Sequence, residues 1–431
     1  MNFKPVNKLP NMEDISSEII QKRNRILYEL GSFINLYGYD QVETPIIEET
    51  ELFIRKSGGE LSNKLYSFVE PGGNNVSLRP EITSGLVRTA NQKINTSKNL
   101  RFYYSGPVFR YSPPDGIYAN KSRQYTQFGA ELFGSKSIHS DAEILSIAIK
   151  GLNKIGIKNP KICIFNMKII NEILSIFNIS DRGRLFLIKN VEIIKRLPNK
   201  EILNKAKSIG IIKNNKIEKN KTHSKDSVNG LVGRRTKADI LSRIKLKETF
   251  FDEKERFLSA LKFVKKVYAI SGTPDKSLSK FTKLINNYDE EFKVFSNYFT
   301  DLLDALKIEK INISNIIFDF GLSKSISYYN GLIFDIFVND KSFDSIASGG
   351  RYDDLNKILG YKNNLPALGF AYNIDEIIKI LKIEEEKVSE KILIQTNDNN
   401  IKEIINKANT ARESGCRSYV EYIDWLWQIY E

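Results

Sequence analysis

The first forty residues carry apolar side chains at intervals of three and four, the spacing that places them on one face of a helix. The pattern predicts a helix that ends near Tyr37, and either Asp14 or Ser16 is suited to cap its start. Residues 42–47 then predict a short strand. Pro45 lies within this segment and favours an edge or an interface, because proline donates no hydrogen bond to a neighbouring strand.

Short apolar segments separated by turns follow, a pattern typical of antiparallel strands. They occupy residues 65–69, 76–78 and 102–104 early in the chain, and 316–320, 326–329 and 332–338 later. Asn330-Gly331 between the last two predicts a hairpin, because both residues tolerate the positive φ of a tight turn. Near the end, residues 391–395 predict a strand and residues 401–414 an amphipathic helix.

Residues 165–305, between the two sets of strands, have a helical pattern, with Phe257, Leu261, Val264 and Tyr268 on one helix face. We therefore predict an α+β fold in which an antiparallel sheet core is flanked by helices and interrupted by a helical insertion. The boundaries that follow are 1–165 and 306–385 for the core, 166–305 for the insertion and 389–431 for a short C-terminal α/β segment.

Length and composition limit the class of protein. A chain of 431 residues is long enough for roughly two or three domains. It has no run of about 18 apolar residues, and its first residues lack the apolar stretch of a secretory signal, so we expect a cytoplasmic protein without membrane contact. Cys163 and Cys416 are far apart and lack metal-ligand spacing, which indicates neither a disulfide framework nor a metal site.

The net charge of +13 raises the question of a polyanionic partner. Basic residues are densest in residues 213–247, but no aromatic side chains alternate with them there to stack on bases. Lysine is also abundant throughout the chain. A solvated surface is therefore the better interpretation of this region, and we do not expect nucleic-acid binding.

The segment Leu78 to Thr83 resembles the Leu-Arg-Pro-Glu-Gly-Thr motif of histidyl-tRNA synthetase, a class II aminoacyl-tRNA synthetase. The resemblance implies that Glu81 and Thr83 bind the amino group of histidine, and a carboxylate beside a hydroxyl suits an ammonium. The same residues also suit the start of a helix, where a glutamate is stabilised by the helix dipole. Both interpretations stay open.

Two further segments, Val108 to Pro114 and Arg123 to Glu131, resemble the second class II motif. The resemblance implies that Arg110 contacts the α-phosphate of ATP and the substrate carboxylate, and that Gln127 and Glu131 meet the polar groups and imidazole of histidine. Ser112 stands where the family usually has glutamate. A structural role on a half-buried strand is the alternative for Gln127 and Glu131.

Leu322 to Gly331 resembles the histidine-specific motif Leu-Val-Arg-Gly-Leu-Asp-Tyr-Tyr, with Lys324 in place of its arginine. Lysine keeps the charge but lacks the planar fork that binds phosphate or carboxylate at two points. Tyr328 and Tyr329 match the two tyrosines, either as walls of an imidazole pocket or as ordinary core.

The segments Ser348 to Leu355 and Leu365 to Ile377 resemble the closing class II motif, whose arginine clamps the ATP phosphates. Glu376 takes the place of that arginine. A like-charge pair at ~4 Å costs roughly 1 kcal/mol in water and about 4 kcal/mol at a surface-like dielectric constant. This substitution therefore predicts weaker nucleotide binding.

The changes at Ser112, Lys324 and Glu376, with a C-terminal domain expected to hold only one strand and one helix, favour a non-catalytic member of this family. The related family with that combination is the regulatory subunit of ATP phosphoribosyltransferase, in histidine biosynthesis. It implies histidine as effector, a short-form catalytic subunit as partner, a homodimer, and neither cofactor nor catalytic residues. The alternatives are a divergent histidyl-tRNA synthetase that activates histidine with ATP and Mg²⁺, and a synthetase-like RNA-binding or interaction module.

Overall fold

The computed structural model describes most of the chain in two units, Met1–Leu381 and Lys382–Glu431. The described residues are 4–57, 62–94, 99–113, 121–212, 252–285, 293–323, 328–338, 345–381, 392–396, 401–416 and 418–422. The basic region 213–247 and Lys324 lie outside them. No helix in these ranges is both long and apolar enough to cross a membrane.

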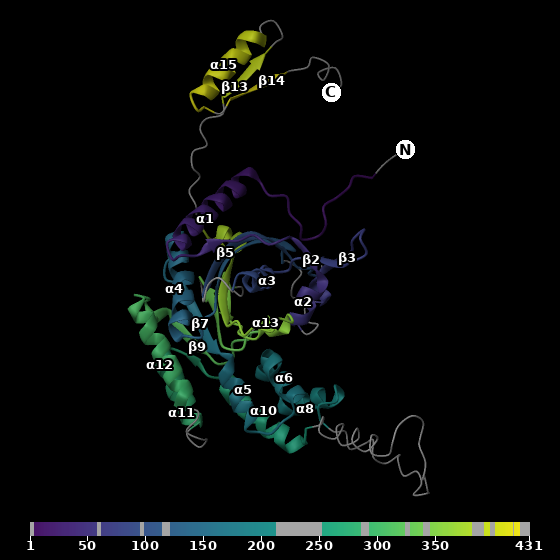
Figure 1. Cartoon of the computed structure of the whole chain (residues 1–431), viewed down its shortest axis with the longest axis vertical. Coiled ribbons are helices and arrows are strands. Elements are labelled where there is room, and N and C mark those ends of the chain that lie inside the picture. The colour runs from purple at the N-terminus through teal and green to yellow at the C-terminus, as the bar shows by residue number, and fades with distance from the viewer. Residues whose placement is uncertain are drawn as a thin grey trace. The chain divides into compact units, whose positions relative to one another are not determined.

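A nine-stranded sheet forms the centre of the first unit (Figure 1). In spatial order its strands are β1 (Asp40–Gln41), β5 (Leu100–Phe109), β6 (Gln124–Phe133), β12 (Ala367–Asn373), β11 (Ala347–Arg351), β10 (Leu332–Phe337), β7 (Lys161–Asn166), β9 (Ile316–Asp319) and β8 (Ser271–Gly272). The β1–β5 and β7–β9 pairs are parallel and the other pairs are antiparallel. The predicted α+β fold is confirmed, with a mixed sheet.

The first helix, α1 (Ser17–Asn35), matches its prediction. Its side chains buried at every fourth position are Ile26, Leu30 and Ile34. Of the two candidate caps, Ser16 is the one used: its hydroxyl accepts a hydrogen bond from the Ile19 amide. This bond satisfies one of the free amides that every helix start exposes.

The strand predicted over residues 42–47 was wrong in its bounds. The structure has β1 before this segment and β2 (Ile47–Glu49) at its end. Pro45 interrupts the hydrogen-bonding pattern because it has no N–H. The Thr44 carbonyl instead accepts a 2.7 Å hydrogen bond from the buried Arg79 guanidinium.

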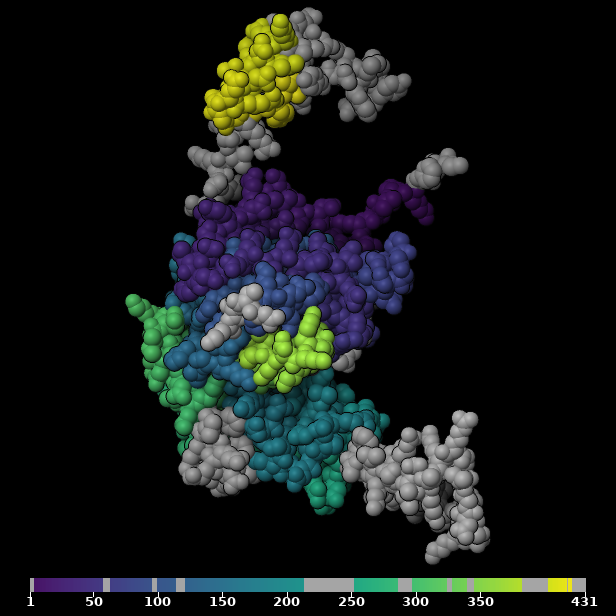
Figure 2. Space-filling view, in the orientation of Figure 1, coloured from purple at the N-terminus to yellow at the C-terminus, as the bar shows by residue number. Residues whose placement is uncertain are grey.

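Three strands from the N-terminal part of the first unit form a small second sheet. Their spatial order is β2, β4 (Asn75–Leu78) and β3 (Tyr66–Val69). Its strands are antiparallel, as predicted for this part of the chain. The short helix α2 (Thr50–Ser57) packs on β4 and contacts α13 (Leu355–Ile358), about 300 residues later. Figure 2 shows the α13 region in light green against the purple and blue N-terminal surface. A turn after β4 leads into α3 (Thr83–Lys93).

Helices pack on the main sheet. They include α4 (Ile138–Lys154), which contacts both α1 and β12, and α14 (Ile374–Ile380), which follows β12 directly. A buried ion pair joins α4 to the end of β11, with 2.7 Å between Arg351 Nη2 and Asp141 Oδ1. Because both side chains are less than one-tenth exposed, this pair fixes the helix against the sheet.

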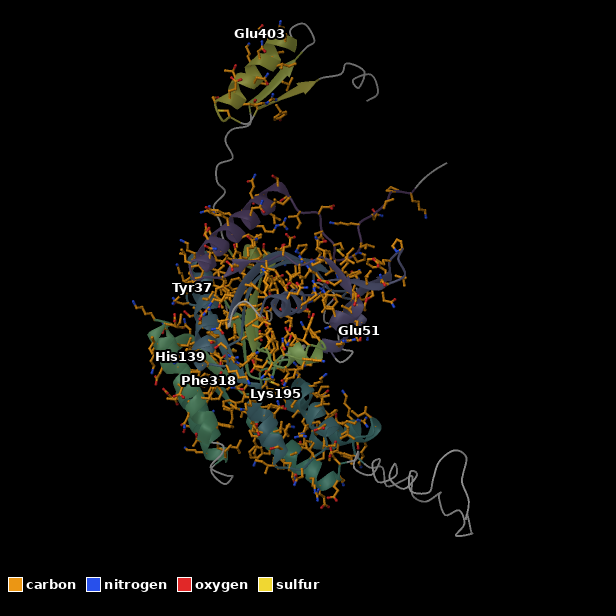
Figure 3. The ribbon with its side chains drawn as sticks, viewed as in Figure 1. Tyr37, Glu51, His139, Lys195, Phe318 and Glu403 are labelled. Carbon is orange, nitrogen blue, oxygen red and sulfur yellow. The ribbon has the colours of Figure 1, made fainter. Side chains whose placement is uncertain are left out.

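The helical pattern between β7 and β9 is confirmed. The helices here are α5 (Met167–Ser175), α6 (Asp181–Lys189), α7 (Val191–Arg196), α8 (Asn199–Ser208), α10 (Lys254–Tyr268), α11 (Pro274–Ile285) and α12 (Lys293–Ile308). The predicted apolar face of α10 is buried. Lys195 of α7, labelled in Figure 3, belongs to this region. Its Nζ donates a 3.1 Å hydrogen bond to the Gly321 carbonyl. A separate domain over residues 166–305 stays a prediction.

Residues 328–331, the described part of the first strand and turn of the predicted hairpin, do not form that hairpin. Tyr328 and Tyr329 lie outside any strand, and neither turn residue has a positive φ. Both edges of β10 are already occupied, one by β7 and the other by β11. Asn330 instead accepts a hydrogen bond from the Asp353 amide and donates one to the Asp354 carboxylate.

The second unit contains β13 (Ile392–Thr396), α15 (Ile401–Glu413) and β14 (Ser418–Tyr422). The predicted strand and helix are confirmed, but the expectation of a single strand was wrong, because β14 pairs in parallel with β13. Its tyrosine and valine side chains favour a strand, and Ser418 also donates to the Ala408 carbonyl of α15. Trp425, Trp427 and Tyr430 lie outside the described residues.

Candidate functional site

A cavity of about 330 Å³ lies over β6 and β12 beside the start of α3. All seven residues that the sequence singled out for histidine binding line it: Glu81, Thr83, Arg110, Gln127, Glu131, Tyr328 and Tyr329. They come from segments almost 250 residues apart. The structure therefore brings together the whole predicted set, while their binding roles stay predictions.

Strand pairing and glycine explain how β6 presents two polar side chains to the cavity. Gln127 and Glu131 are four positions apart and thus share one face of the strand. Between them, Gly129 leaves space for Tyr104, since a Cβ at this glycine would lie 2.5 Å from the tyrosine hydroxyl. On β12, Gly369 pairs with Glu131, and a Cβ at Gly369 would lie 1.6 Å from the Glu131 carboxylate.

Glu81 lies where β4 turns into α3, and its carboxylate is almost fully buried. It accepts hydrogen bonds of 3.2 and 3.3 Å from the Ser84 amide, so the helix-start interpretation is confirmed. Its Oε1 also lies 2.9 Å from Nζ of Lys56, whose side chain is 0% exposed. Burial favours the neutral acid, but the Lys56 ammonium and the Ser84 hydrogen bonds outweigh it and lower the pKa of Glu81.

Glu131 has a different environment although its carboxylate is also buried. The Thr83 hydroxyl donates to Oε1 at 2.8 Å and the Tyr352 hydroxyl donates to Oε2 at 2.5 Å. Burial raises the pKa of Glu131 to about 8, and the two hydroxyl donors act against that rise. The cavity therefore holds one carboxylate that is charged near neutral pH and one carboxyl that takes up a proton readily.

Two polar groups at the cavity have unused hydrogen-bonding capacity. The buried Gln127 side-chain oxygen Oε1 has no hydrogen-bond partner within the described ranges. Arg110 donates through Nε to the Pro80 carbonyl at 2.8 Å and lies 5.5 Å from the Tyr125 ring centroid. Its two terminal nitrogens have no hydrogen-bond partner in the described part of the chain. An unsatisfied acceptor and a guanidinium can thus both serve a ligand.

Aromatic rings form another wall. The Tyr328 and Tyr329 ring centroids are 4.6 Å apart, and Tyr352 meets Tyr328 edge to face at 5.4 Å. Tyr328 also belongs to the hydrophobic cluster around α3 and β5. Tyr328 is therefore a core residue that also lines the cavity, and its role beside an imidazole stays a prediction.

Of the three altered positions, Ser112 and Glu376 are not among the residues that line the cavity, and Lys324 lies outside the described residues. Ser112 is buried, and its carbonyl accepts two hydrogen bonds from Arg123. Glu376 lies in the first turn of α14, where its carboxylate forms a 2.7 Å ion pair with Lys379. Neither residue lines the cavity. The Glu376 charge is thus partly balanced within its own helix, which reduces the repulsion expected from the sequence.

The sequence analysis missed Lys56, Tyr104 and Tyr352 as site residues. Tyr352 lies within the glycine-rich closing motif, which is the one local signal that points to it. Lys56 lies on α2, in the segment that reads Phe-Ile-Arg-Lys-Ser, and nothing in its spacing predicts contact with Glu81. Among the described residues, no group of three or more potential ligand side chains is placed to hold a metal ion.

The fold agrees with the comparisons to known proteins. The sequence model for "Histidyl-tRNA synthetase" matches residues 11–211 and 252–377, which is most of the chain. The chain belongs to the histidyl-tRNA synthetase family. A relative named histidine–tRNA ligase, from Sulfurisphaera tokodaii, is 32% identical over 399 residues, covering 91% of this chain and 78% of the relative. The ligase of Pyrococcus furiosus is 26% identical, covering 96% of this chain and 85% of its own length.

Solved structures support the same fold for this synthetase-family chain. A Bacillus halodurans protein described as an ATP phosphoribosyltransferase regulatory subunit/histidyl-tRNA synthetase has a TM-score of 0.67 and 21% identity, covering 97% of this chain and 94% of that one. The histidyl-tRNA synthetase of Nostoc has a TM-score of 0.65 and 16% identity, with 100% and 88% covered. At these identities the likeness concerns the fold alone.

Proposed function

We propose that the cavity binds histidine and that the chain is a histidine–tRNA ligase, which activates histidine with ATP. The observation that carries the proposal is that one cavity holds both the Arg110 guanidinium, whose terminal nitrogens have no partner among the described residues, and the unsatisfied Gln127 oxygen Oε1. The first suits an anion and the second suits a hydrogen-bond donor. Histidine offers both, as a carboxylate and as ammonium or imidazole N–H groups.

The Glu131 side chain fits the imidazole end of such a ligand. A buried carboxyl with a raised pKa can donate a hydrogen bond when protonated and accept one when ionised. The imidazole ring has the same dual character, because one nitrogen donates and the other accepts when the ring is neutral. Tyr329 and Tyr328 supply flat apolar surfaces beside it.

In the proposed reaction, a carboxylate oxygen of histidine attacks the α-phosphorus of ATP, and pyrophosphate leaves with the bonding electron pair. The product is histidyl-adenylate. Arg110 would stabilise the charge on the α-phosphate and hold the carboxylate, which a guanidinium does well because it donates at two points. The buried wall of β6 would exclude water, which competes for a reactive adenylate.

The second candidate is a non-catalytic regulatory subunit of ATP phosphoribosyltransferase, which would bind histidine and act on a short-form catalytic subunit. Glu376 favours it, because an acidic residue replaces the family's phosphate-binding arginine. The Glu376–Lys379 ion pair limits the strength of this argument, since it reduces the charge presented to a phosphate. The ligase-named relatives over about nine-tenths of the chain favour the first candidate.

Histidine-dependent exchange of labelled pyrophosphate into ATP tests the proposal on the purified full chain. We expect exchange that requires histidine and falls at least about tenfold in Arg110→Ala, because a charged partner of the reacting groups is lost. A matched control is Arg25→Ala, which changes an exposed arginine on α1. Histidine binding without exchange would overturn the ligase proposal and support the regulatory candidate.

A further inference from the structure

Lys56 occupies a place in which a lysine is rarely found. Its side chain is fully buried at the end of α2, with Nζ 2.9 Å from the Glu81 carboxylate and 4.1 Å from the Tyr328 ring centroid. A buried ammonium is costly unless a charge compensates it. Glu81 is its ion-pair partner, and the face of the tyrosine ring adds a second favourable contact.

The partner of this lysine also belongs to the cavity. Glu81 lines the cavity, whereas Lys56 does not. The Glu81 oxygens are already engaged by the Lys56 ammonium and by the Ser84 amide. A ligand ammonium that reaches Glu81 would therefore meet a carboxylate whose charge is balanced by a second ammonium 2.9 Å away.

We propose that Lys56 determines the charge selectivity of the cavity: by balancing the charge of Glu81 in an ion pair, it removes most of the preference for a ligand ammonium at that end. This inference rests on the proposed function for its ligand, histidine. In the wild-type protein, affinity for histidine then comes mainly from the carboxylate and imidazole ends. Lys56 is a selectivity residue that acts through Glu81 and need not touch the ligand.

The test compares histidine with 3-(imidazol-4-yl)propanoate, which lacks only the α-amino group. Calorimetry gives the ratio of their dissociation constants for wild type and for Lys56→Met, which replaces the lysine with an uncharged side chain of similar length. We expect the preference for histidine to rise about tenfold or more in Lys56→Met, because the buried Glu81 carboxylate loses its ion-pair partner and can pair with the ligand ammonium. Lys150→Met is the control, because it removes an ammonium paired with Glu309 away from the cavity.

Two further variants keep the test decisive if Lys56→Met folds poorly. Glu81→Gln leaves Lys56 uncompensated, so the preference for histidine should fall below the wild-type value. In Lys56→Met/Glu81→Gln both charges are absent, and the preference should return toward that value. A merely structural ion pair would leave the ratio unchanged in every variant that folds.

The outcomes separate this inference from the proposed function. Binding of both ligands with an unchanged ratio in Lys56→Met and Glu81→Gln would overturn the role of Lys56 and leave the histidine site intact. Binding of neither ligand by wild type or any variant would overturn both.

Discussion

The hydroxyl of Tyr352 donates a 2.5 Å hydrogen bond to Oε2 of Glu131, although the two residues are 221 positions apart in the chain. Tyr352 follows β11 and Glu131 lies on β6, and β12 runs between these strands. The Thr83 hydroxyl engages the other carboxylate oxygen at 2.8 Å. Three segments thus fix the position of one buried acid at the cavity.

Replacing Tyr352 with phenylalanine should destabilise the fold. The change removes one of the two hydroxyl donors to Glu131 and leaves a buried carboxyl oxygen unsatisfied, which costs about 1–3 kcal/mol. Urea unfolding of wild type and variant measures the difference. Tyr28→Phe is the matched control, because that side chain is 77% exposed, and its stability should stay close to wild type. Equal effects of the two substitutions would contradict the importance of the bond.

The raised pKa of Glu131 predicts a pH-dependent stability. The folded chain keeps this proton up to about pH 8, whereas the unfolded chain releases it near 4.5. Between these values the unfolded state binds fewer protons, so the Glu131 contribution to stability falls as pH rises, by at most about 1.4 kcal/mol per pH unit.

Glu131→Gln cannot titrate and serves as the reference. Denaturant unfolding of both proteins from pH 5 to pH 8 should show wild type losing stability relative to the variant as pH rises. A difference that stays constant or grows in favour of wild type would show that Glu131 is ionised throughout.

Gly369 should tolerate no larger side chain. The Cβ of an alanine would lie 1.6 Å from the Glu131 carboxylate and 2.4 Å from the Ala130 carbonyl, so either the strand or the acid must move. We expect Gly369→Ala to lower the melting temperature and to weaken histidine binding. Gly31→Ala on α1 is the control, since its Cβ would meet the Tyr103 hydroxyl at an ordinary 3.5 Å. Alanine there should stabilise the helix by up to about 1 kcal/mol.

The buried Arg351–Asp141 pair should be sensitive to the loss of one partner. Arg351→Met leaves the Asp141 carboxylate uncompensated next to β11, and breaking such a pair costs about 3–5 kcal/mol. Adding Asp141→Asn should recover part of this loss, because the remaining charge is then removed. Unfolding free energies of the two single variants and the double variant measure the coupling, and additive effects would rule it out.

Local patterns predicted the elements whose burial repeats at a regular interval. The apolar stripe of α1 and the buried face of α10 follow the helical period, and β5 contains the apolar segment 102–104 from which a strand was predicted. Local patterns did not predict which of the later strands pair with one another. The Asn330-Gly331 hairpin failed because β7, 166 residues or more earlier in the chain, occupies the edge of β10 that a hairpin partner requires.

In the candidate site, too, local motifs predicted some residues, whereas contacts that depend on tertiary packing were missed. The motifs singled out seven of the residues that line the cavity, since each has a local signature in the sequence. The Lys56–Glu81 contact depends on how α2 packs on β4, a tertiary relationship that leaves no periodic trace. Likewise, the Glu376–Lys379 pair reduces a charge that the sequence alone presents as unopposed.

Calorimetric titration with histidine and with histidinol, which lacks the carboxylate, tests most directly the central claim that this cavity binds histidine through Arg110. We predict that wild type binds histidine and prefers it over histidinol by about tenfold or more, because the terminal nitrogens of Arg110 have no partner within the described ranges and can donate to a carboxylate. In Arg110→Ala this preference should disappear. No detectable binding of histidine, or equal affinity of wild type for the two ligands, would contradict the claim.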